Sequence, residues 1–170
     1  MDKKNLELEF DMGDVEEEFI ETDVQRVQQI IKNLFSNSVK FTETGSISME
    51  VSKPDAKFKF INKNLNRKNS ILISVTDTGI GIPKEKQDII FEAFKQADGT
   101  TSRKYGGTGL GLSISRNFAT ILGGEMQLRS KESQGAKFTL VLPTNIVDKV
   151  EKEEQKYEDK TEVLNETTTQ

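Results

Sequence analysis

Apolar and polar residues alternate with two different periods in the first part of the chain. Leucine and phenylalanine alternate with glutamate over residues 6–10, and a period of two is typical of a strand. From Asp23 to Lys40 the apolar residues recur every three or four positions and fall on one broad helical face. Thr22 and Asp23 are both suited to cap the N-terminus of that helix. The pattern therefore predicts a strand followed by a long amphipathic helix.

Four later segments also have the character of strands. Residues 45–51 alternate, and residues 71–75 form a nearly continuous apolar run, as in a strand that is covered on both faces. Residues 126–129 and 136–142 predict two more strands, joined by a turn near Gly135. We therefore expect a sheet of about five strands.

Two further helices are predicted between these strands. Pro83 suits the first turn of one helix, whose apolar side comes from residues 89–94. Helical spacing returns over residues 109–122 and ends at the glycine pair 123–124. The segment between them, Lys95 to Thr108, is rich in Gly, Thr, Ser and Lys, and we expect it to be a mobile loop.

Composition narrows the chemistry that this chain can perform. A length of 170 residues corresponds to about one domain. The absence of cysteine and histidine excludes disulfides, thiolate catalysis, imidazole bases and phosphohistidine within the chain. The net charge of −4, without a basic helix, argues against a nucleic-acid partner. No apolar run approaches the roughly 20 residues of a membrane span, so we expect a cytoplasmic setting and no membrane contact by this segment.

Two segments differ in charge from the rest of the predicted domain, 1–144. Residues 53–69 carry six basic residues against one aspartate. We interpret them as a basic insertion, either a solvated hairpin extension or a docking surface for an acidic partner. Residues 145–170 contain few large apolar groups, so burial cannot offset their ordering entropy, and we expect an acidic linker or disordered tail.

The sequence contains three groups of polar residues that could bind a ligand. The first consists of Asn33, Asn37 and Lys40. At about 100° per residue they fall within an arc of roughly 60°, at the border of the apolar helix face. An amide oxygen can ligate Mg²⁺ together with phosphate oxygens and waters. A lysine beside it would neutralise phosphate charge. The alternative interpretation is an ordinary solvated helix flank.

The second group is Asp77 with Gly79 and Gly81, at the end of the apolar run. A carboxylate there is costly unless it is hydrogen-bonded, and the exocyclic amine of adenine is a fitting donor. Glycines without side chains would let a flat ring approach the backbone. The alternative is a tight turn with a capping aspartate.

The third group is the glycine-rich run 106–112, which opens a predicted helix. Free amides at a helix N-terminus bind anions, and glycine lets phosphate come close. The run matches neither the P-loop nor the dinucleotide fingerprint. A hinge that binds no ligand is the alternative.

Together, and in this order, the three groups resemble the sequence boxes of sensor histidine kinases. Residues 33–41 resemble the N box, residues 77–81 the G1 box, residues 91–94 the F box, and residues 107–111 the G2 box. The resemblance extends from about residue 5 to residue 143. It implies a catalytic, ATP-binding domain of the Bergerat (GHKL) type, an α/β fold in which a mixed sheet packs on helices in a two-layer sandwich.

The resemblance also implies roles for individual residues. Asn37 would ligate Mg²⁺, Asn33 would line the same pocket, and Lys40 would contact phosphate. Asp77 would accept the adenine amine, beside Phe41, while glycines 79 and 81 shape the base pocket. The remaining residues that the resemblance places at the nucleotide are Ile82, Phe94, Lys95, Arg103, Lys104, Gly107, Thr108, Gly109, Leu110, Gly111 and Leu112.

The implied reaction is transfer of the ATP γ-phosphate to a histidine on a separate dimerisation domain. Gln96 stands where many members carry a basic residue, and the spacing around it looks like that of the hybrid subgroup, so Lys95, Arg103 or Lys104 would supply the charge. Two alternatives stay open: a nucleotide-binding module without transfer activity, and a GHKL-type ATPase. ATPases of this type usually carry glutamate in place of Asn33, and an amide cannot take a proton. A response-regulator receiver domain after the acidic tail is a further hypothesis.

Overall fold

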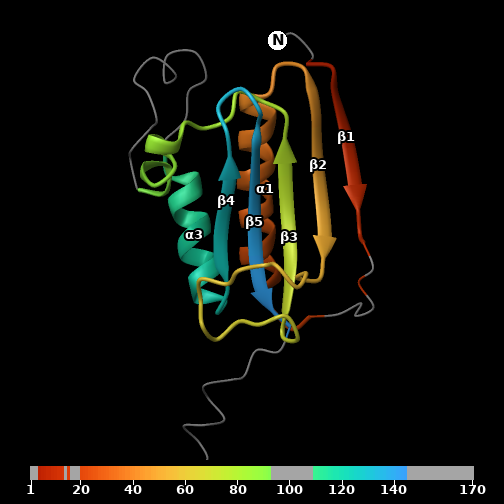
Figure 1. Cartoon of the computed structure of the whole chain (residues 1–170), viewed down its shortest axis with the longest axis vertical. Helices are drawn as coiled ribbons and strands as arrows, with labels where there is room; N and C mark the ends of the chain where they lie inside the picture. The colour runs from red at the N-terminus through yellow and green to blue at the C-terminus, as the bar shows by residue number, and fades with distance from the viewer. Residues whose placement is uncertain (1–3, 14, 16–19, 93–108, 145–170) are drawn as a thin grey trace, which may run out of the picture.

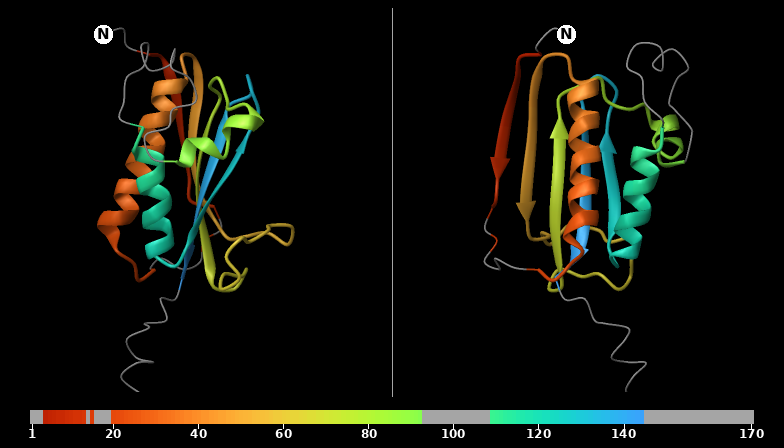
Figure 2. Two further views of the ribbon diagram at one scale, coloured as in Figure 1. Left: turned by 90° about the vertical axis from the view of Figure 1, so that its left-hand side faces the viewer. Right: turned by 180° about the vertical axis from the view of Figure 1, so that it is seen from behind.

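The computed structural model describes residues 4–13, 15, 20–92 and 109–144, which form two layers (Figures 1 and 2). One layer is a five-stranded mixed sheet, and the other consists of two helices that lie together on one of its faces. This arrangement confirms the predicted α/β sandwich. The prediction for residues 145–170 lies outside the described residues.

The five strands and the two longer helices occur where the sequence predicts them. In chain order the elements are β1 (Leu6–Asp11), α1 (Val24–Phe41), β2 (Gly45–Ser52), β3 (Ser70–Asp77), α3 (Gly111–Ile121), β4 (Glu125–Ser130) and β5 (Ala136–Pro143). Their order across the sheet is β1-β2-β3-β5-β4. β1 pairs with β2 in parallel, and all other neighbours are antiparallel. None of the helices within the described ranges is long and apolar enough to cross a bilayer.

Helix α1 is held at both ends by side chains. At its N-terminus the carboxylate of Asp23, one of the two predicted caps, accepts the backbone N–H of Arg26 at 3.0 Å. At its C-terminus the ammonium of Lys4 donates to the carbonyl oxygens of Val39, Lys40 and Thr42 at 2.9–3.1 Å. A cation at this end also interacts favourably with the helix dipole. The last turns of α1 therefore have a defined position relative to the sheet.

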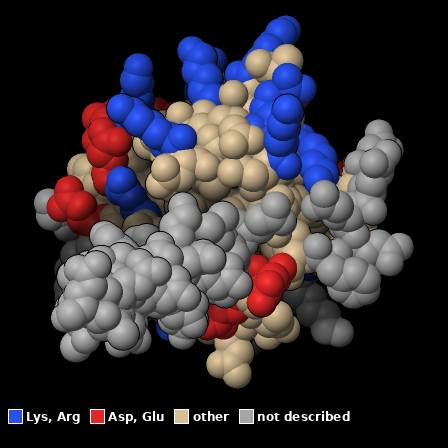
Figure 3. All heavy atoms as spheres, turned by 90° about the horizontal axis from the view of Figure 1, so that it is seen from below, with Lys and Arg blue, Asp and Glu red and all other residues tan. Residues whose placement is uncertain are grey.

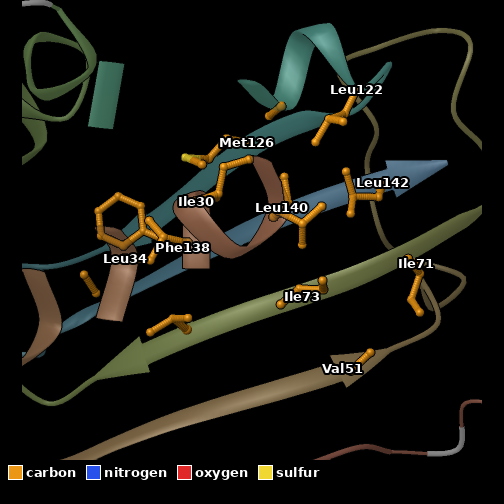
Figure 4. Packing of buried hydrophobic residues seen from close by; sticks show 14 of the residues in the cluster. Ile30, Leu34, Val51, Ile71, Ile73, Leu122, Met126, Phe138, Leu140 and Leu142 are labelled. Atoms are coloured by element: carbon orange, nitrogen blue, oxygen red, sulfur yellow. The ribbon is translucent and has the colours of Figure 1, made fainter. Parts of the chain in front are cut away.

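The core lies between α1, α3 and the sheet. Ile30 and Leu34 of α1 are inaccessible to solvent, and Figure 4 shows them over Phe138 and Leu140 of β5. Alternate residues of β2, β3, β4 and β5 point into this layer, and the sheet contributes Ile47, Val51, Ile71, Ile73, Val75, Met126, Phe138, Leu140 and Leu142. This packing fixes the face of α1 that turns away from solvent.

The other face of the sheet is partly covered by the loop of residues 53–69, which we call the basic loop (Figure 2). It forms turns rather than the paired strands of a hairpin. Phe58 and Phe60 pack with Leu65 on the sheet, and the carboxylate of Glu125 accepts the backbone N–H of Ile61 at 2.9 Å and that of Asn62. Most of its basic side chains stay exposed, and basic side chains project from one side of the molecule in Figure 3.

The helix predicted from Pro83 to residue 94 is wrong in its described part. Two 3₁₀ turns occur instead, η1 (Lys84–Lys86) and η2 (Ile89–Phe91). Between them the Gln87 amide donates to the carbonyl of Ile82 at 2.9 Å and to that of Ser130 at 3.0 Å. These bonds hold the segment against the end of β4, so the chain turns where a helix would continue.

The core can be tested with a pair of leucines of different burial. Leu34 is fully buried, so Leu34→Ala should lower the free energy of unfolding by about 2–5 kcal/mol in urea denaturation. Leu8 on β1 is 52% exposed, and Leu8→Ala should cost roughly 1 kcal/mol or less. Equal losses for the two variants would contradict the packing described for α1.

Candidate nucleotide site

Asp77 is the last residue of β3, and only 6% of the residue is exposed. One oxygen of its carboxylate accepts the backbone N–H of Gly79 at 2.9 Å, and the other accepts the Ser38 hydroxyl of α1 at 3.2 Å. Burial raises the pKa of this carboxyl, and the hydrogen bonds from Gly79, Ser38 and the backbone of Ala136 oppose that shift. A buried acceptor of this kind is well suited to an N–H donor of a ligand.

Gly79 is surrounded by oxygen atoms from three residues. A Cβ atom at this position would lie 2.5 Å from the carbonyl oxygen of Phe41, 2.8 Å from Thr42 Oγ1 and 3.0 Å from Asp77 Oδ1. The Thr42 hydroxyl is fully buried and makes no hydrogen bond to the described residues. A buried polar atom without a partner is costly, so a water or a ligand atom is expected here.

Gly81 is required by the protein backbone itself. Its φ is +66°, and a Cβ atom would lie 2.0 Å from the carbonyl oxygen of Lys131 in the turn between β4 and β5. The next residue, Ile82, donates its N–H to Ser130 Oγ at 2.8 Å and packs on the core. Internal packing therefore explains glycine at both 79 and 81, and no ring needs to be invoked.

The two asparagines of α1 have different surroundings. Asn33 is engaged with α3, because its amide nitrogen donates to the Gly111 carbonyl and to Ser115 Oγ, both at 3.1 Å. The half-buried amide of Asn37 makes no hydrogen bond to the residues that the structure describes. Of the two amides, that of Asn37 is therefore the one whose hydrogen-bonding groups are not used by the described residues.

Lys40 and Phe41 complete the C-terminal turn of α1. The ammonium of Lys40 lies 4.9 Å from the centre of the Phe41 ring, within the range of a cation–π contact. Burial lowers the pKa of Lys40. Both side chains are partly exposed, so they remain accessible from solvent at this end of the helix.

The first turn of α3 is the second half of the site. Gly109 has a φ of +69°, which glycine adopts without strain, and Leu110 caps the helix without any side-chain hydrogen bond. The N–H groups of the first turn have no partner within a helix, so they are available to an anion. A Cβ atom at Gly111 would lie 3.7 Å from Asn33 Cγ, an ordinary contact. Nothing described on the protein side therefore requires glycine at 111.

Helix α1 connects these two halves. Ser38 contacts the Asp77 carboxylate, and Asn33, five residues earlier, contacts the start of α3. Five residues correspond to about 7.5 Å along a helix. A ligand lying beside α1 would meet a hydrogen-bond acceptor at one end and free N–H groups at the other. A purine amine and a chain of phosphates have this polarity.

No group of three or more acidic, histidine or cysteine residues that could hold a metal occurs in the described part of the chain. A cation at this site would therefore need oxygen atoms from the ligand. Mg²⁺ is bound in this way, by one or two protein oxygens with phosphates and waters. The amide of Asn37, which makes no hydrogen bond to the described residues, fits that requirement.

Several predicted site residues have no described position. These are Phe94, Lys95, Arg103, Lys104, Gly107 and Thr108, together with Gln96. Leu112 is described and packs against the core.

Sequence reasoning missed three polar residues of the site: Ser38, Thr42 and Ser115. The first two continue the stripe of Ile30 and Leu34 at a spacing of four, where apolar side chains are expected. Small hydroxyl residues on a buried stripe were the available signal. The contact of Ser115 with α1 joins residues 82 positions apart, and no local pattern predicts it.

Fold and site together define an ATP-binding α/β sandwich. The chain belongs to the family described as histidine kinase-, DNA gyrase B-, and HSP90-like ATPases, which it matches over residues 22–146. It is an ATP-binding catalytic domain of the kind found in sensor histidine kinases.

Three curated relatives illustrate the similarity. The autoinducer 2 sensor kinase/phosphatase LuxQ of Vibrio harveyi is 42% identical over 76% of this chain, which spans 14% of its length. Signal transduction histidine-protein kinase BarA of Escherichia coli K12 is 41% identical over 79% of this chain, again 14% of its length. Hybrid signal transduction histidine kinase A of Dictyostelium discoideum is 42% identical over 71% of this chain and 6% of its length.

Solved structures agree with this assignment. The catalytic domain of the histidine kinase ThkA has a TM-score of 0.64 and 27% identity, covering 83% of this chain and 80% of that one. Full-length ShkA in complex with AMPPNP has the same TM-score and 28% identity, covering 84% of this chain and 27% of that one.

The raised pKa of Asp77 predicts how Asp77→Asn alters stability with pH. The folded chain binds this proton more tightly than the unfolded chain, so the carboxyl's contribution to stability falls as pH rises from the ordinary carboxyl pKa to the raised one. An asparagine side chain does not titrate, so the variant has no such decrease in stability at this position. The unfolding free energy of Asp77→Asn minus that of the wild type should therefore grow as pH rises from about 4 and then level off. A difference that shrinks as pH rises would show that the folded pKa is lowered.

Proposed function

We propose that this domain binds ATP with Mg²⁺ and transfers the γ-phosphate to a histidine on a separate dimerisation domain. The observation that carries the proposal is the different character of the two ends of the site, which α1 connects. The Asp77 carboxylate is fixed at one end, and the uncapped first turn of α3 lies at the other. ATP has an amine at one end and phosphates at the other, and the chain belongs to a family of ATPases, so we propose ATP as the ligand.

At the base end, Asp77 would accept the exocyclic amine of adenine. The carboxylate cannot turn away, because Ser38 and Gly79 hold one oxygen each. The unpartnered Thr42 hydroxyl beside Gly79 would take a water or a ring nitrogen. Phe41 would pack near the base.

At the phosphate end, the N–H groups of the first turn of α3 would bind phosphate oxygens, with glycines 109 and 111 allowing close approach. Asn37 would ligate Mg²⁺, and Lys40 would contact phosphate. Bound Mg²⁺ would neutralise phosphate charge during the transfer. Among the residues without a described position, Lys95, Arg103 and Lys104 are the candidates for additional positive charge.

The side chain of Asn33 favours phosphate transfer over ATP hydrolysis, because it cannot act as a general base. An amide cannot take a proton from water, and both hydrogens of this one are engaged with α3. A histidine acceptor has a lone pair at neutral pH and depends less on such a base. Since the 170 residues contain no histidine, the acceptor histidine would lie outside them.

The partners follow from the same chemistry. We propose two partners: the histidine-bearing dimerisation domain and, because one relative is named a hybrid signal transduction histidine kinase, a response-regulator receiver domain. The exposed cations of the basic loop are available to an acidic partner surface. We place the domain in the cytoplasm, where ATP is available.

Asn37→Ala tests the metal assignment. It should remove the Mg²⁺-dependent part of ATP affinity, so calorimetric titrations with Mg²⁺ and with EDTA should give nearly equal affinities for this variant. Phosphate transfer to a histidine-bearing domain should be abolished. Asn117→Ala, at an exposed asparagine of α3, is the matched control and should behave as the wild type. Undiminished Mg²⁺ dependence in Asn37→Ala would refute the assignment.

Gly111→Ala separates nucleotide binding from stability. The added methyl makes only ordinary contacts with Asn33, and alanine is the better helix former, so the unfolding free energy should be unchanged or slightly higher. If phosphate approaches the backbone here, ATP affinity should fall by roughly tenfold or more, since a lost charge-assisted hydrogen bond costs about 1.5–3 kcal/mol. Unchanged affinity in a stable variant would place the phosphates elsewhere.

A further inference from the structure

The amide of Asn33 joins the two helices of the domain. Its nitrogen donates one hydrogen bond to the Gly111 carbonyl and one to Ser115 Oγ, each 3.1 Å long. Its oxygen accepts the side-chain N–H of Gln29, one turn earlier on α1, also at 3.1 Å. Every hydrogen of the amide is therefore used, and the group has a single orientation.

Ser115 is fully buried, although it is a polar residue in the second turn of α3. Alanine would fill the same place at lower cost if only packing mattered there, because a buried hydroxyl must be hydrogen-bonded. Its oxygen instead accepts from Asn33 across the helix interface. We call the contacts of Asn33 with Gly111 and Ser115 the interhelix latch.

The chemistry of the latch requires an amide at position 33. Both atoms that face the Asn33 nitrogen are oxygens, and a carbonyl such as that of Gly111 can only accept. A carboxylate at this position would set acceptor against acceptor. An amide supplies two donors in a fixed plane, so it sets both the distance and the rotation of α3 relative to α1.

The latch attaches at the first two turns of α3. Gly111 is the first residue of that helix, directly after Gly109 and Leu110, and it belongs to the turn that carries the free N–H groups. The helix has no side-chain cap of its own at this end. The interhelix latch therefore holds the first turn of α3 against α1. Asn37 lies on the same helix α1, one turn after Asn33.

We propose that Asn33 and Ser115 are positioning residues that hold the first turn of α3 in register with α1, so that its N–H groups are preorganised for the phosphates of the nucleotide. This inference rests on the proposed function, because it concerns the phosphate end of the same site. The role of Ser115 is indirect: it fixes Asn33 and the helix, and it touches no ligand.

The test compares two ligands that differ only in phosphates. The full chain is titrated with ATP by calorimetry and with adenosine by NMR. Ser115→Ala should weaken ATP binding by roughly five- to tenfold, the effect of one lost hydrogen bond, and should change adenosine affinity less than twofold. A residue that only stabilises the fold would not discriminate between these ligands.

A double-mutant cycle isolates the interhelix contact. In an Asn33→Ala background, Ser115→Ala should have little further effect on ATP affinity, because its partner is already absent. Ser74→Ala is the matched control. It removes another buried hydroxyl, which pairs with Thr139 on the opposite face of the sheet, and it should leave both affinities unchanged.

The outcomes are distinct. Equal losses for ATP and adenosine, additive effects in the cycle, or no loss in Ser115→Ala would each overturn the latch while leaving ATP binding intact. A wild-type chain that fails to bind ATP would overturn the proposed function itself. Urea unfolding of each variant verifies that it is folded at the temperature of the titration.

Discussion

The hydrogen bond between Ser38 and Asp77 joins the last turns of α1 to the end of β3, and the site depends on it. It fixes a carboxylate that the fold has removed from water. Burial raises the pKa of that carboxyl, so the ionised form is disfavoured in the folded chain. A buried carboxylate whose ionised form is disfavoured in the folded chain is more typical of a binding site than of a structural turn.

Helix α1 combines two tasks through its periodicity. Ile30 and Leu34 of α1 are buried in the core, and Ser38 and Thr42 continue the same buried stripe. The Ser38 hydroxyl donates to the Asp77 carboxylate, and the Thr42 hydroxyl lies beside Gly79. The border of the stripe carries Asn33 and Asn37. Because one helix carries all of these groups, its packing sets the distance between the Asp77 carboxylate and the first turn of α3. A polar rim on a well-packed helix is more precise than a site built from loops.

Most of the fold could be predicted from the pattern of apolar residues, because both long helices bury one regular face and β3 is a continuous apolar run that is buried on both faces. The segment after Pro83 could not be predicted. The Gln87 amide donates to the carbonyl of Ile82, which precedes the segment, and to that of Ser130, which is 43 positions away, and no local pattern indicates either bond. Asp77 and Asn37 could be proposed from residue type and spacing. The engagement of Asn33 with Gly111 could not, because it joins residues 78 positions apart. The glycines at 79 and 81 were predicted for the right loop, but internal packing is sufficient to require them.

The central claim is that the Asp77 carboxylate accepts a hydrogen bond from the exocyclic amine of adenine. Guanine carries a carbonyl oxygen at the equivalent position, and a carboxylate acceptor would repel it. Calorimetric titration of the full chain with ATP and with GTP, both in the presence of Mg²⁺, tests this directly. The account predicts that ATP binds at least about tenfold more tightly than GTP, as expected when a site built for an N–H donor meets an acceptor. Equal affinities for the two nucleotides would contradict it.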